Sequence, residues 1–225
     1  RIGKKNEIQL AVVDRLDEIS YASGYAHHPI GGILRDVTLF ALPESHLYDI
    51  GVETHLDSLY QDADLRFFCK FSGQESTEME LRLKDKSGKY ELEIIVFQNG
   101  QETSRFSRNI GFREVKIIKD RMLVNGHQVK LRGACRHDIH PTLGRTTTLE
   151  LDSLDAVLFK QANMNFVRTS HYPPTERFLE FCDRYGIYVE SETAVCFVDT
   201  YRQKNYKPGR SQNDPAFAER YLGQC

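Results

Sequence analysis

Arginine, histidine and tyrosine side chains lie within five positions of one another in the stretch "NFVRTSHYPPTERFLEFCDRYGIYVESE", residues 165–192. Arg168, His171 and Tyr172 can all donate hydrogen bonds, and histidine can also accept or transfer a proton near neutral pH. They follow a short apolar run and precede a helix-like stretch, so they occupy a loop between a strand and a helix. Such loops often carry binding or catalytic residues.

Polar residues end two further predicted strands in the same part of the chain. Arg136, His137 and Asp138 close "QVKLRGACRH", and Glu190 and Glu192 come at the end of "IYVES". In a parallel α/β fold, binding and catalytic side chains gather at the carboxyl ends of the strands. Three polar strand ends in succession therefore predict a functional site.

The elements that must position these residues form a regular alternation after about Val129. "LELDSLDAVLFKQAN" has apolar residues at helical spacing, and "TERFLEFCDRYG" predicts a second helix with Gly186 at its C-terminal cap. "NFVRTS" predicts a short buried strand between them. The order strand, helix, strand, helix, strand indicates a βαβαβ arrangement with a parallel sheet. The amphipathic stripe predicted for the first helix consists of Leu151, Leu154, Leu158 and Ala162.

Upstream, from about residue 5 to residue 131, the pattern is that of short strands. Apolar residues alternate in "NEIQLAVV", "DLRFFCKF", "EMELRLK" and "YELEIIVF". Turn-forming residues separate these runs, including 85–88, Asn99-Gly100 and Asn125-Gly126. This texture predicts an antiparallel β-sandwich.

Composition limits the classes of function. The 225 residues carry a formal charge of −2 with pI near 6.5, which gives no electrostatic basis for binding nucleic acid or an anionic membrane. No apolar run approaches the ~20 residues that span a bilayer, and no signal peptide is evident. Five dispersed cysteines without a CxxC pair argue against a disulfide framework and favour a reducing compartment.

Each candidate residue also has a simpler interpretation. Arg168 could pair with a neighbouring carboxylate for structural reasons, and His137 and His171 could be ordinary buried histidines. His137, Asp138 and His140 have types suited to a metal, but the spacing is not diagnostic. Glu190 and Glu192 share strand parity and could act as an acid/base pair, although such glutamates more often bind hydroxyls. No nucleotide-binding glycine motif and no nucleophile elbow is present.

The sequence closely resembles the signature of glycoside hydrolase family 2, which includes β-galactosidases, β-glucuronidases and β-mannosidases. The match runs through "NFVRTSHYP" and continues at Phe178-Leu179, Asp183, Gly186 and Ile187-Tyr188-Val189. Two upstream stretches, "GGILRDVTLFALPESHLYDIGVET" and "VNGHQVKLRGACRHDIHPTLG", resemble the family's domain junctions. The resemblance covers the chain from about Asn6 onward.

The resemblance implies three segments. Residues 1–43 would end a jelly-roll sugar-binding domain, residues 44–113 would form an immunoglobulin-like β-sandwich, and residues 114–225 would begin a (β/α)8 TIM-barrel catalytic domain. The family's acid/base and nucleophile glutamates would then lie beyond Cys225, so this span would contain no catalytic residue and be inactive alone. The parent enzyme would be a retaining, β-galactosidase-like glycosidase acting on a β-linked carbohydrate.

The resemblance also assigns roles to individual residues. The expected substrate-binding residues are His137, Asp138, Arg168, His171 and Glu192. No cofactor is expected. The places at which related galactosidases hold magnesium correspond to Cys196 and Val198, so no metal is expected there.

Alternatives remain at this stage. A non-catalytic carbohydrate-binding or scaffold fragment is the main one, and an α/β enzyme with a histidine-bound metal is the other. Neither nucleic acid nor a membrane is an expected partner, and the composition leaves a homo-oligomer possible. The sugar and its linkage are not readable from these residues.

Overall fold

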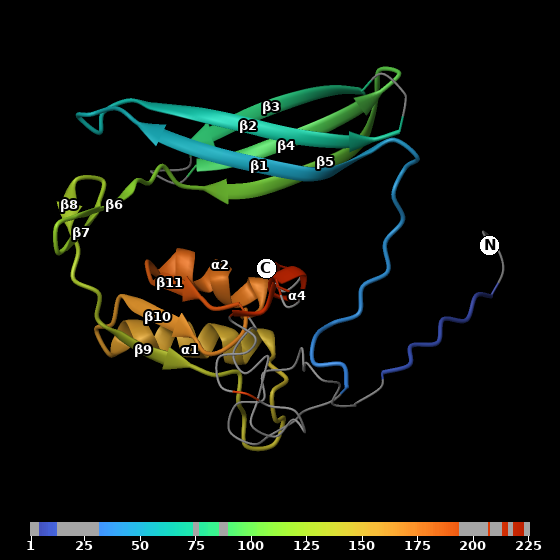
Figure 1. Ribbon diagram of the computed structural model, residues 1–225. Helices are drawn as coiled ribbons and strands as arrows, with labels where there is room; N and C mark the ends of the chain where they lie inside the picture. Colours follow the sequence, from blue (N-terminus) through green and yellow to red (C-terminus); the bar gives the residue numbers. More distant parts are fainter. Residues whose placement is uncertain are drawn as a thin grey trace. The chain divides into compact units, whose positions relative to one another are not determined.

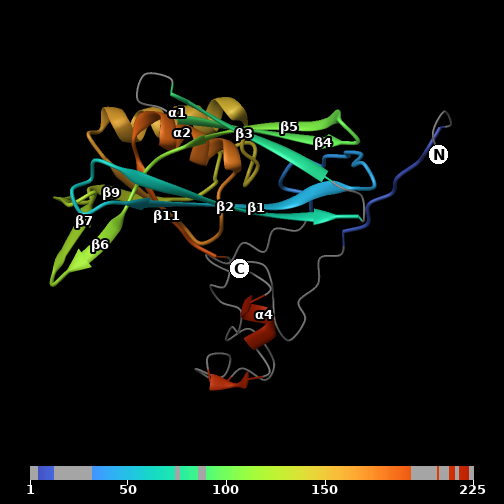
Figure 2. The same cartoon turned by 90° about the horizontal axis from the view of Figure 1, so that it is seen from above.

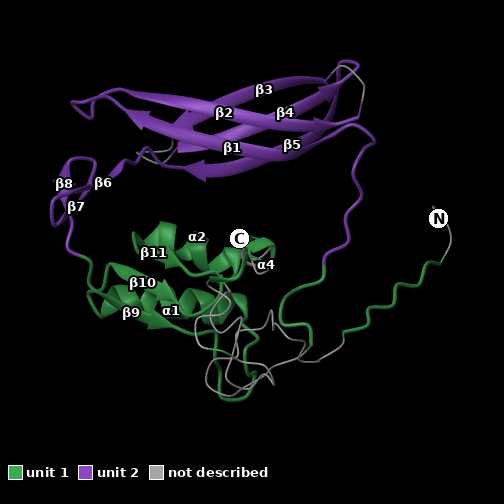
Figure 3. Cartoon of the chain, in the orientation of Figure 1, with its two compact units in different colours: residues 1–37, 131–225 green, residues 38–130 purple. Residues whose placement is uncertain are grey.

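The structure, a computed structural model, describes residues 5–12, 32–73, 77–85, 90–193, 207, 213–215 and 218–222 (Figure 1). The chain divides into two compact units, shown in different colours in Figure 3. Unit 1 comprises residues 1–37 and 131–225, and unit 2 comprises residues 38–130. None of the described residues belongs to a helix that is both long and apolar enough to cross a membrane.

Unit 2 consists of antiparallel β-structure. Its strands are β1 (His46–Leu56), β2 (Ala63–Ser72), β3 (Thr77–Asp85), β4 (Tyr90–Gln98), β5 (Gln101–Ile110), β6 (Val115–Ile118), β7 (Arg121–Val124) and β8 (His127–Gln128). They form the sheets β1-β2, β3-β4-β5 and β6-β7-β8. Asn99-Gly100 and Asn125-Gly126 have positive φ angles at the β4–β5 and β7–β8 turns, as their sequence predicts.

One apolar cluster joins the first two sheets of unit 2. Leu92, Ile94 and Val96 of β4 are buried, and the alternating residues of β2 pack against them. The prediction of alternating strands in 64–71 and 90–97 is therefore confirmed. In β3 only Met79 joins the cluster, whereas Leu81 and Leu83 are exposed.

The predicted strand in "NEIQLAVV" is not found. Residues 5–12 have no regular secondary structure, and the alternating Ile8, Leu10 and Val12 are exposed to solvent. Alternation alone does not form a strand, because the backbone hydrogen bonds need a neighbouring strand and the apolar face needs a surface to pack on.

Unit 1 contains a parallel three-stranded sheet in the order β11-β10-β9. Its elements are β9 (Gly133–Arg136), α1 (Leu149–Gln161), β10 (Phe166–Thr169), α2 (Glu176–Tyr185), β11 (Tyr188–Ser191) and α4 (Ala218–Leu222). Both neighbouring pairs are parallel, which confirms the predicted βαβαβ arrangement. Figure 2 shows α1 and α2 on the same side of this sheet.

Helix α2 begins and ends where the sequence indicates. The Thr175 side chain accepts a hydrogen bond from the Phe178 N–H, and Gly186 adopts the left-handed conformation at the C-terminal cap. Phe178 and Cys182 are fully buried and pack with Val167 of β10. Burial raises the pKa of the Cys182 thiol to about 12, so this cysteine is a protonated core residue.

Helix α1 lies where it was predicted, and the leucines of its amphipathic stripe are only partly covered. Leu154 and Leu158 are 49% and 50% exposed, whereas Asp152 and Ala156 are completely buried. The buried face of α1 is therefore the row that contains Asp152 and Ala156, whereas the row that contains Leu154 and Leu158 is half exposed. An aspartate can occupy that face because charged and polar partners meet its carboxylate there.

Gly133 sets the spacing between β9 and β10. It is paired with Phe166, and a Cβ atom added at Gly133 would lie 1.8 Å from the Phe166 carbonyl oxygen. No side chain fits there without moving one strand. Gly111 provides a contrast, because no atom lies within 4 Å of the corresponding position.

We expect Gly133→Ala to separate β9 from β10 and to lower the local free energy of opening by about 3 kcal/mol, as severe overpacking does. Hydrogen exchange of the β10 amides should then speed up by roughly 100-fold. Gly111→Ala is the matched control and should leave exchange in β10 unchanged. Equal protection of β10 in the Gly133→Ala variant would contradict the close approach of these strands.

Candidate functional site

The carboxyl ends of β10 and β11 bring two predicted site residues into contact. The His171 Nδ1 atom lies 2.8 Å from the Glu192 Oε1 atom. The Glu192 N–H donates to the Thr169 hydroxyl oxygen over 3.1 Å, which fixes the end of β11 against the end of β10. Both side chains are largely shielded, with 16% and 18% exposure for His171 and Glu192. The polar residues at the ends of these two neighbouring strands therefore lie in contact, as their positions in the sequence indicated.

Arg168 contacts the same carboxylate from β10. Its Nη2 atom lies 2.7 Å from the Glu192 Oε2 atom, and its Nε atom lies 3.7 Å from the Glu190 Oε1 atom. Glu192 is thus bound on one oxygen by the histidine and on the other by the arginine. This arrangement fixes the carboxylate, and the simpler interpretation of Arg168 as an ion-pair partner describes its contact with Glu192.

His137 completes the group at the end of β9. Its ring packs edge-on against His171, with 5.5 Å between ring centroids. Burial lowers the pKa of His137 below its usual range, and the neighbouring His171 and Arg145 lower the pKa further. A neutral imidazole is therefore favoured at pH 7, and it can donate one hydrogen bond and accept another. We call Arg168, His137, His171 and Glu192 the strand-end cluster.

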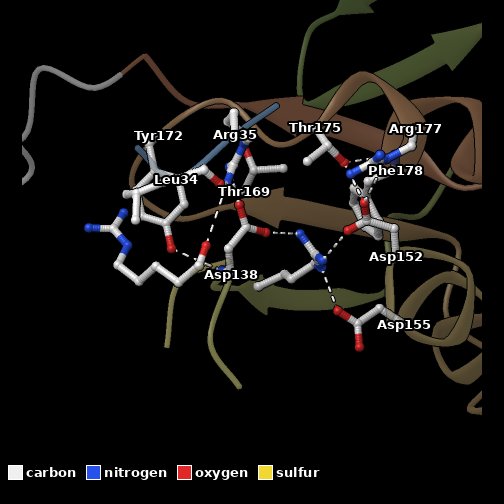
Figure 4. Close-up of polar contacts among 12 residues, drawn as sticks. Leu34, Arg35, Asp138, Asp152, Asp155, Thr169, Tyr172, Thr175, Arg177 and Phe178 are labelled. Carbon is white, nitrogen blue, oxygen red and sulfur yellow. Dashed lines mark hydrogen bonds and ion pairs between the residues drawn. The ribbon is translucent and has the colours of Figure 1, made fainter. Parts of the chain in front are cut away.

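Asp138 is next to this cluster but is directed elsewhere. Its side chain is only 2% exposed. Arg136 donates to its Oδ1 atom, and Arg35 donates to its Oδ2 atom over 2.5 Å (Figure 4). The Asp138 backbone N–H donates to the Tyr172 hydroxyl oxygen over 2.9 Å. A sugar hydroxyl bound by Asp138 would have to share an oxygen with an arginine.

Arg136, the last residue of β9, is buried, and its guanidinium bonds with three aspartates. Besides Asp138, it donates from Nε to Asp155 over 2.7 Å and from Nη2 to Asp152 over 3.1 Å. Its guanidinium carbon lies 3.9 Å from the centroid of the Phe178 ring. We call these four charged residues the acid–arginine network. Asp152 also accepts from the hydroxyl of Thr175, the α2 cap, over 2.6 Å (Figure 4).

Sequence reasoning missed the acid–arginine network and the contact from Arg35. Arg136 was noted only as one polar residue among three at a strand end. Its burial could have been suspected from its place in a short strand packed beneath helices. No local signal marks Arg35, which meets Asp138 from 103 positions away.

No metal-binding group is evident in the part of the chain that the structure describes. Nowhere in those residues are three or more His, Cys, Asp or Glu side chains grouped so that they could hold an ion. His137, Asp138 and His140 thus do not form such a group. Cys196 and Val198 lie outside the described residues, so the expectation for that position stays a prediction.

The site has the character of an α/β barrel enzyme. Parallel strands alternate with helices, and the ionisable side chains meet at the carboxyl ends of the strands, where such barrels carry their active sites. Histidines, a carboxylate and an arginine in contact can bind a polyhydroxylated molecule and can stabilise charge that develops on it.

Comparison with known proteins gives the family. Residues 115–224 match the family model "Glycosyl hydrolases family 2, TIM barrel domain". The chain is 30% identical to a β-galactosidase of Alteromonas mediterranea, over 95% of this chain and 24% of that protein. It is 33% identical to the β-galactosidase large subunit of Latilactobacillus sakei, over 72% of this chain and 31% of that one.

A solved structure agrees with this result. The β-glucuronidase from Ruminococcus gnavus, in complex with uronic deoxynojirimycin, matches with a TM-score of 0.61 and 26% identity, covering 68% of this chain and 30% of that chain. The chain belongs to glycoside hydrolase family 2, and its later residues include the start of the TIM barrel domain. It spans between 24% and 31% of the length of these three relatives.

We expect Arg136→Met to destabilise unit 1 by about 3–5 kcal/mol, because removing one partner of a buried ionic network leaves uncompensated charges. Hydrogen exchange of the α1 and α2 amides measures the loss. Arg82→Met is the matched control: Arg82 also pairs with carboxylates, but it is 47% exposed, and its loss should leave exchange of the α1 and α2 amides unchanged.

Charge and packing can be separated by a second variant. If charge is responsible, adding Asp152→Asn and Asp138→Asn to Arg136→Met should restore part of the lost protection. No restoration, or an Arg136→Met variant as protected as the wild type, would contradict this assignment.

Proposed function

We propose that this chain is part of a retaining β-glycosidase, β-galactosidase-like in its substrate, which hydrolyses a β-linked carbohydrate. The observation that carries this proposal is the contact of His171 and Arg168 with Glu192 at the strand ends of a family 2 barrel segment. The names of the relatives support the substrate class, since they include β-galactosidases and a β-glucuronidase.

Retaining glycosidases need two carboxyl groups roughly 5–5.5 Å apart, one as nucleophile and one as acid and then base. Neither role falls to the strand-end cluster, because Glu192 is already engaged by a histidine and an arginine. The catalytic glutamates are placed in other parts of the full-length protein. This chain would then provide one wall of the substrate pocket.

His171 has the best-defined role in that wall. When its Nδ1 atom donates to Glu192, the Nε2 atom of the neutral ring can accept a hydrogen bond from a sugar hydroxyl. Arg168 holds the other oxygen of Glu192, so the histidine ring has a fixed partner. A bond of this kind that strengthens as the oxocarbenium-like transition state forms would raise kcat.

His137 and Asp138 are assigned supporting roles. His137, favoured as a neutral ring beside His171, can donate to one hydroxyl and accept from another. Asp138 is assigned to the same rim, where a hydroxyl would reach its carboxylate alongside the two arginines. His137, Asp138, Arg168, His171 and Glu192 would all contribute to the substrate-binding wall.

The domain organisation is part of the proposal. Residues 1–43 are proposed to end a jelly roll, residues 44–113 to form an immunoglobulin-like sandwich, and residues 114–225 to begin the barrel. The two antiparallel sheets of unit 2 that share one apolar cluster support the sandwich. The proposed partner is a carbohydrate, and a homo-oligomer is compatible with the proposal.

The first test is His171→Ala in the full-length protein. With an aryl β-galactoside as substrate, kcat/KM should fall by on the order of 100-fold, because a transition-state hydrogen bond is lost. His127→Ala is the matched control, since His127 is an exposed histidine of β8, and it should keep wild-type kinetics.

The outcome is decisive when folding is monitored together with the kinetics. A His171→Ala protein that unfolds at the wild-type temperature and retains wild-type kcat/KM would remove His171 from the site. A wild-type protein without hydrolysis of any aryl β-glycoside would overturn the proposed function itself.

A further inference from the structure

We infer that Arg35 and Asp36 form a clamp that positions the loop 137–145, and with it His137, from a distant part of the sequence. The inference rests on the proposed function only where it concerns substrate. It makes Arg35 and Asp36 positioning residues, because they contact other protein groups and not the sugar. The residues stand in unit 1, immediately before unit 2 begins at residue 38.

The clamp has two contact points of opposite charge. Arg35 Nη2 lies 2.5 Å from Asp138 Oδ2, just past the end of β9. Asp36 Oδ2 lies 3.1 Å from Arg177 Nη1, in the first turn of α2. Two adjacent residues thus form ion pairs with oppositely charged residues 103 and 141 positions away. A pair of contacts with alternating signs defines both the position and the direction of this segment.

The two contacts close a ring of alternating charges. From Arg35 the ring runs through Asp138, Arg136, Asp152 and Arg177 to Asp36, and the backbone between Asp36 and Arg35 completes it. The longest link, between Asp152 Oδ2 and Arg177 Nε, is 3.8 Å. Figure 4 shows Arg35 next to Asp138 and Arg177 next to Asp152.

Charge balance explains why the clamp is needed. Arg136 alone faces three aspartates, which are Asp138, Asp152 and Asp155. Asp138 and Asp152 are almost completely buried, so uncompensated charge on them would be costly. Arg35 and Arg177 supply the two further positive charges. Asp36, which is 80% exposed, then holds Arg177 from the solvent side.

The clamp reaches the strand-end cluster through the loop that follows β9. Arg35 Nη1 donates to the Arg145 carbonyl oxygen over 3.5 Å, at the far end of that loop. The Arg145 guanidinium carbon lies 3.9 Å from the centroid of the Tyr172 ring, and the Tyr172 hydroxyl accepts from the Asp138 N–H. Arg35 therefore touches both ends of a loop whose own regular pairing is a single bridge between His140 and Gly144.

Hydrogen exchange and kinetics of Arg35→Gln in the full-length protein test the clamp. Amides in 137–145 should exchange about tenfold faster. The value of kcat/KM for an aryl β-galactoside should fall by roughly tenfold, because His137 is displaced from its productive position. Arg35→Lys keeps the charge and should recover part of both effects. Arg121→Gln is the matched control at an exposed arginine of β7.

A double-mutant cycle shows whether the effect passes through Asp138. In an Asp138→Asn background, adding Arg35→Gln should change exchange in 137–145 by less than about twofold. Asp36→Asn should speed exchange at the start of α2 while kcat/KM changes less than in Arg35→Gln. If Arg35→Gln fails to fold, Arg35→Lys and Asp36→Asn provide the same local measurements.

The outcomes separate the clamp from the proposed function. Wild-type exchange in 137–145 for Arg35→Gln, or equal effects of Arg35→Gln with and without Asp138, would overturn the clamp. Faster exchange confined to 137–145 supports it even if the wild-type protein hydrolyses no glycoside, a result that would overturn only the proposed function.

Discussion

The burial of one guanidinium, that of Arg136, is the constraint on which the rest of unit 1 depends. An arginine remains charged inside a protein, so its surroundings must satisfy it. Each of its three nitrogens bonds to a different aspartate, and its flat face lies on Phe178. Because these partners come from the loop after β9 and from helices α1 and α2, a single side chain determines how those elements meet.

The same group links the core to the surface site. Asp152 accepts a hydrogen bond from Thr175, whose hydroxyl oxygen caps α2, and Asp138, which follows His137 in the chain, accepts one from Arg136. The helix cap and the strand end are therefore held by one hydrogen-bonded system, within which a shift of one member moves the others. Polar residues at strand ends become a site only when such a system fixes their directions.

Much of this arrangement could be predicted from sequence, for reasons that are local. Gly186 ends α2 because it can adopt a left-handed conformation, and the parallel order of the strands follows from the alternation of element types. The proximity of His171 and Glu192 could be predicted because the carboxyl ends of parallel strands lie at one edge of the sheet. The burial of Asp152 on α1 could not be predicted, because leucine spacing does not reveal that a buried arginine requires an aspartate there. Arg35 could not be predicted, since its contact is made across 103 positions.

The choice of an aspartate over a leucine for the buried face of α1 also shows what this region is built for. An apolar side chain at position 152 would save the cost of desolvating a charge, and buried ion pairs often add little net stability. Apolar contacts, however, have no preferred direction, whereas a bond between carboxylate and guanidinium holds both the distance and the plane of its partners. In this part of the fold, directional bonding has been favoured over apolar burial, and the residues that benefit are those next to His137 and His171.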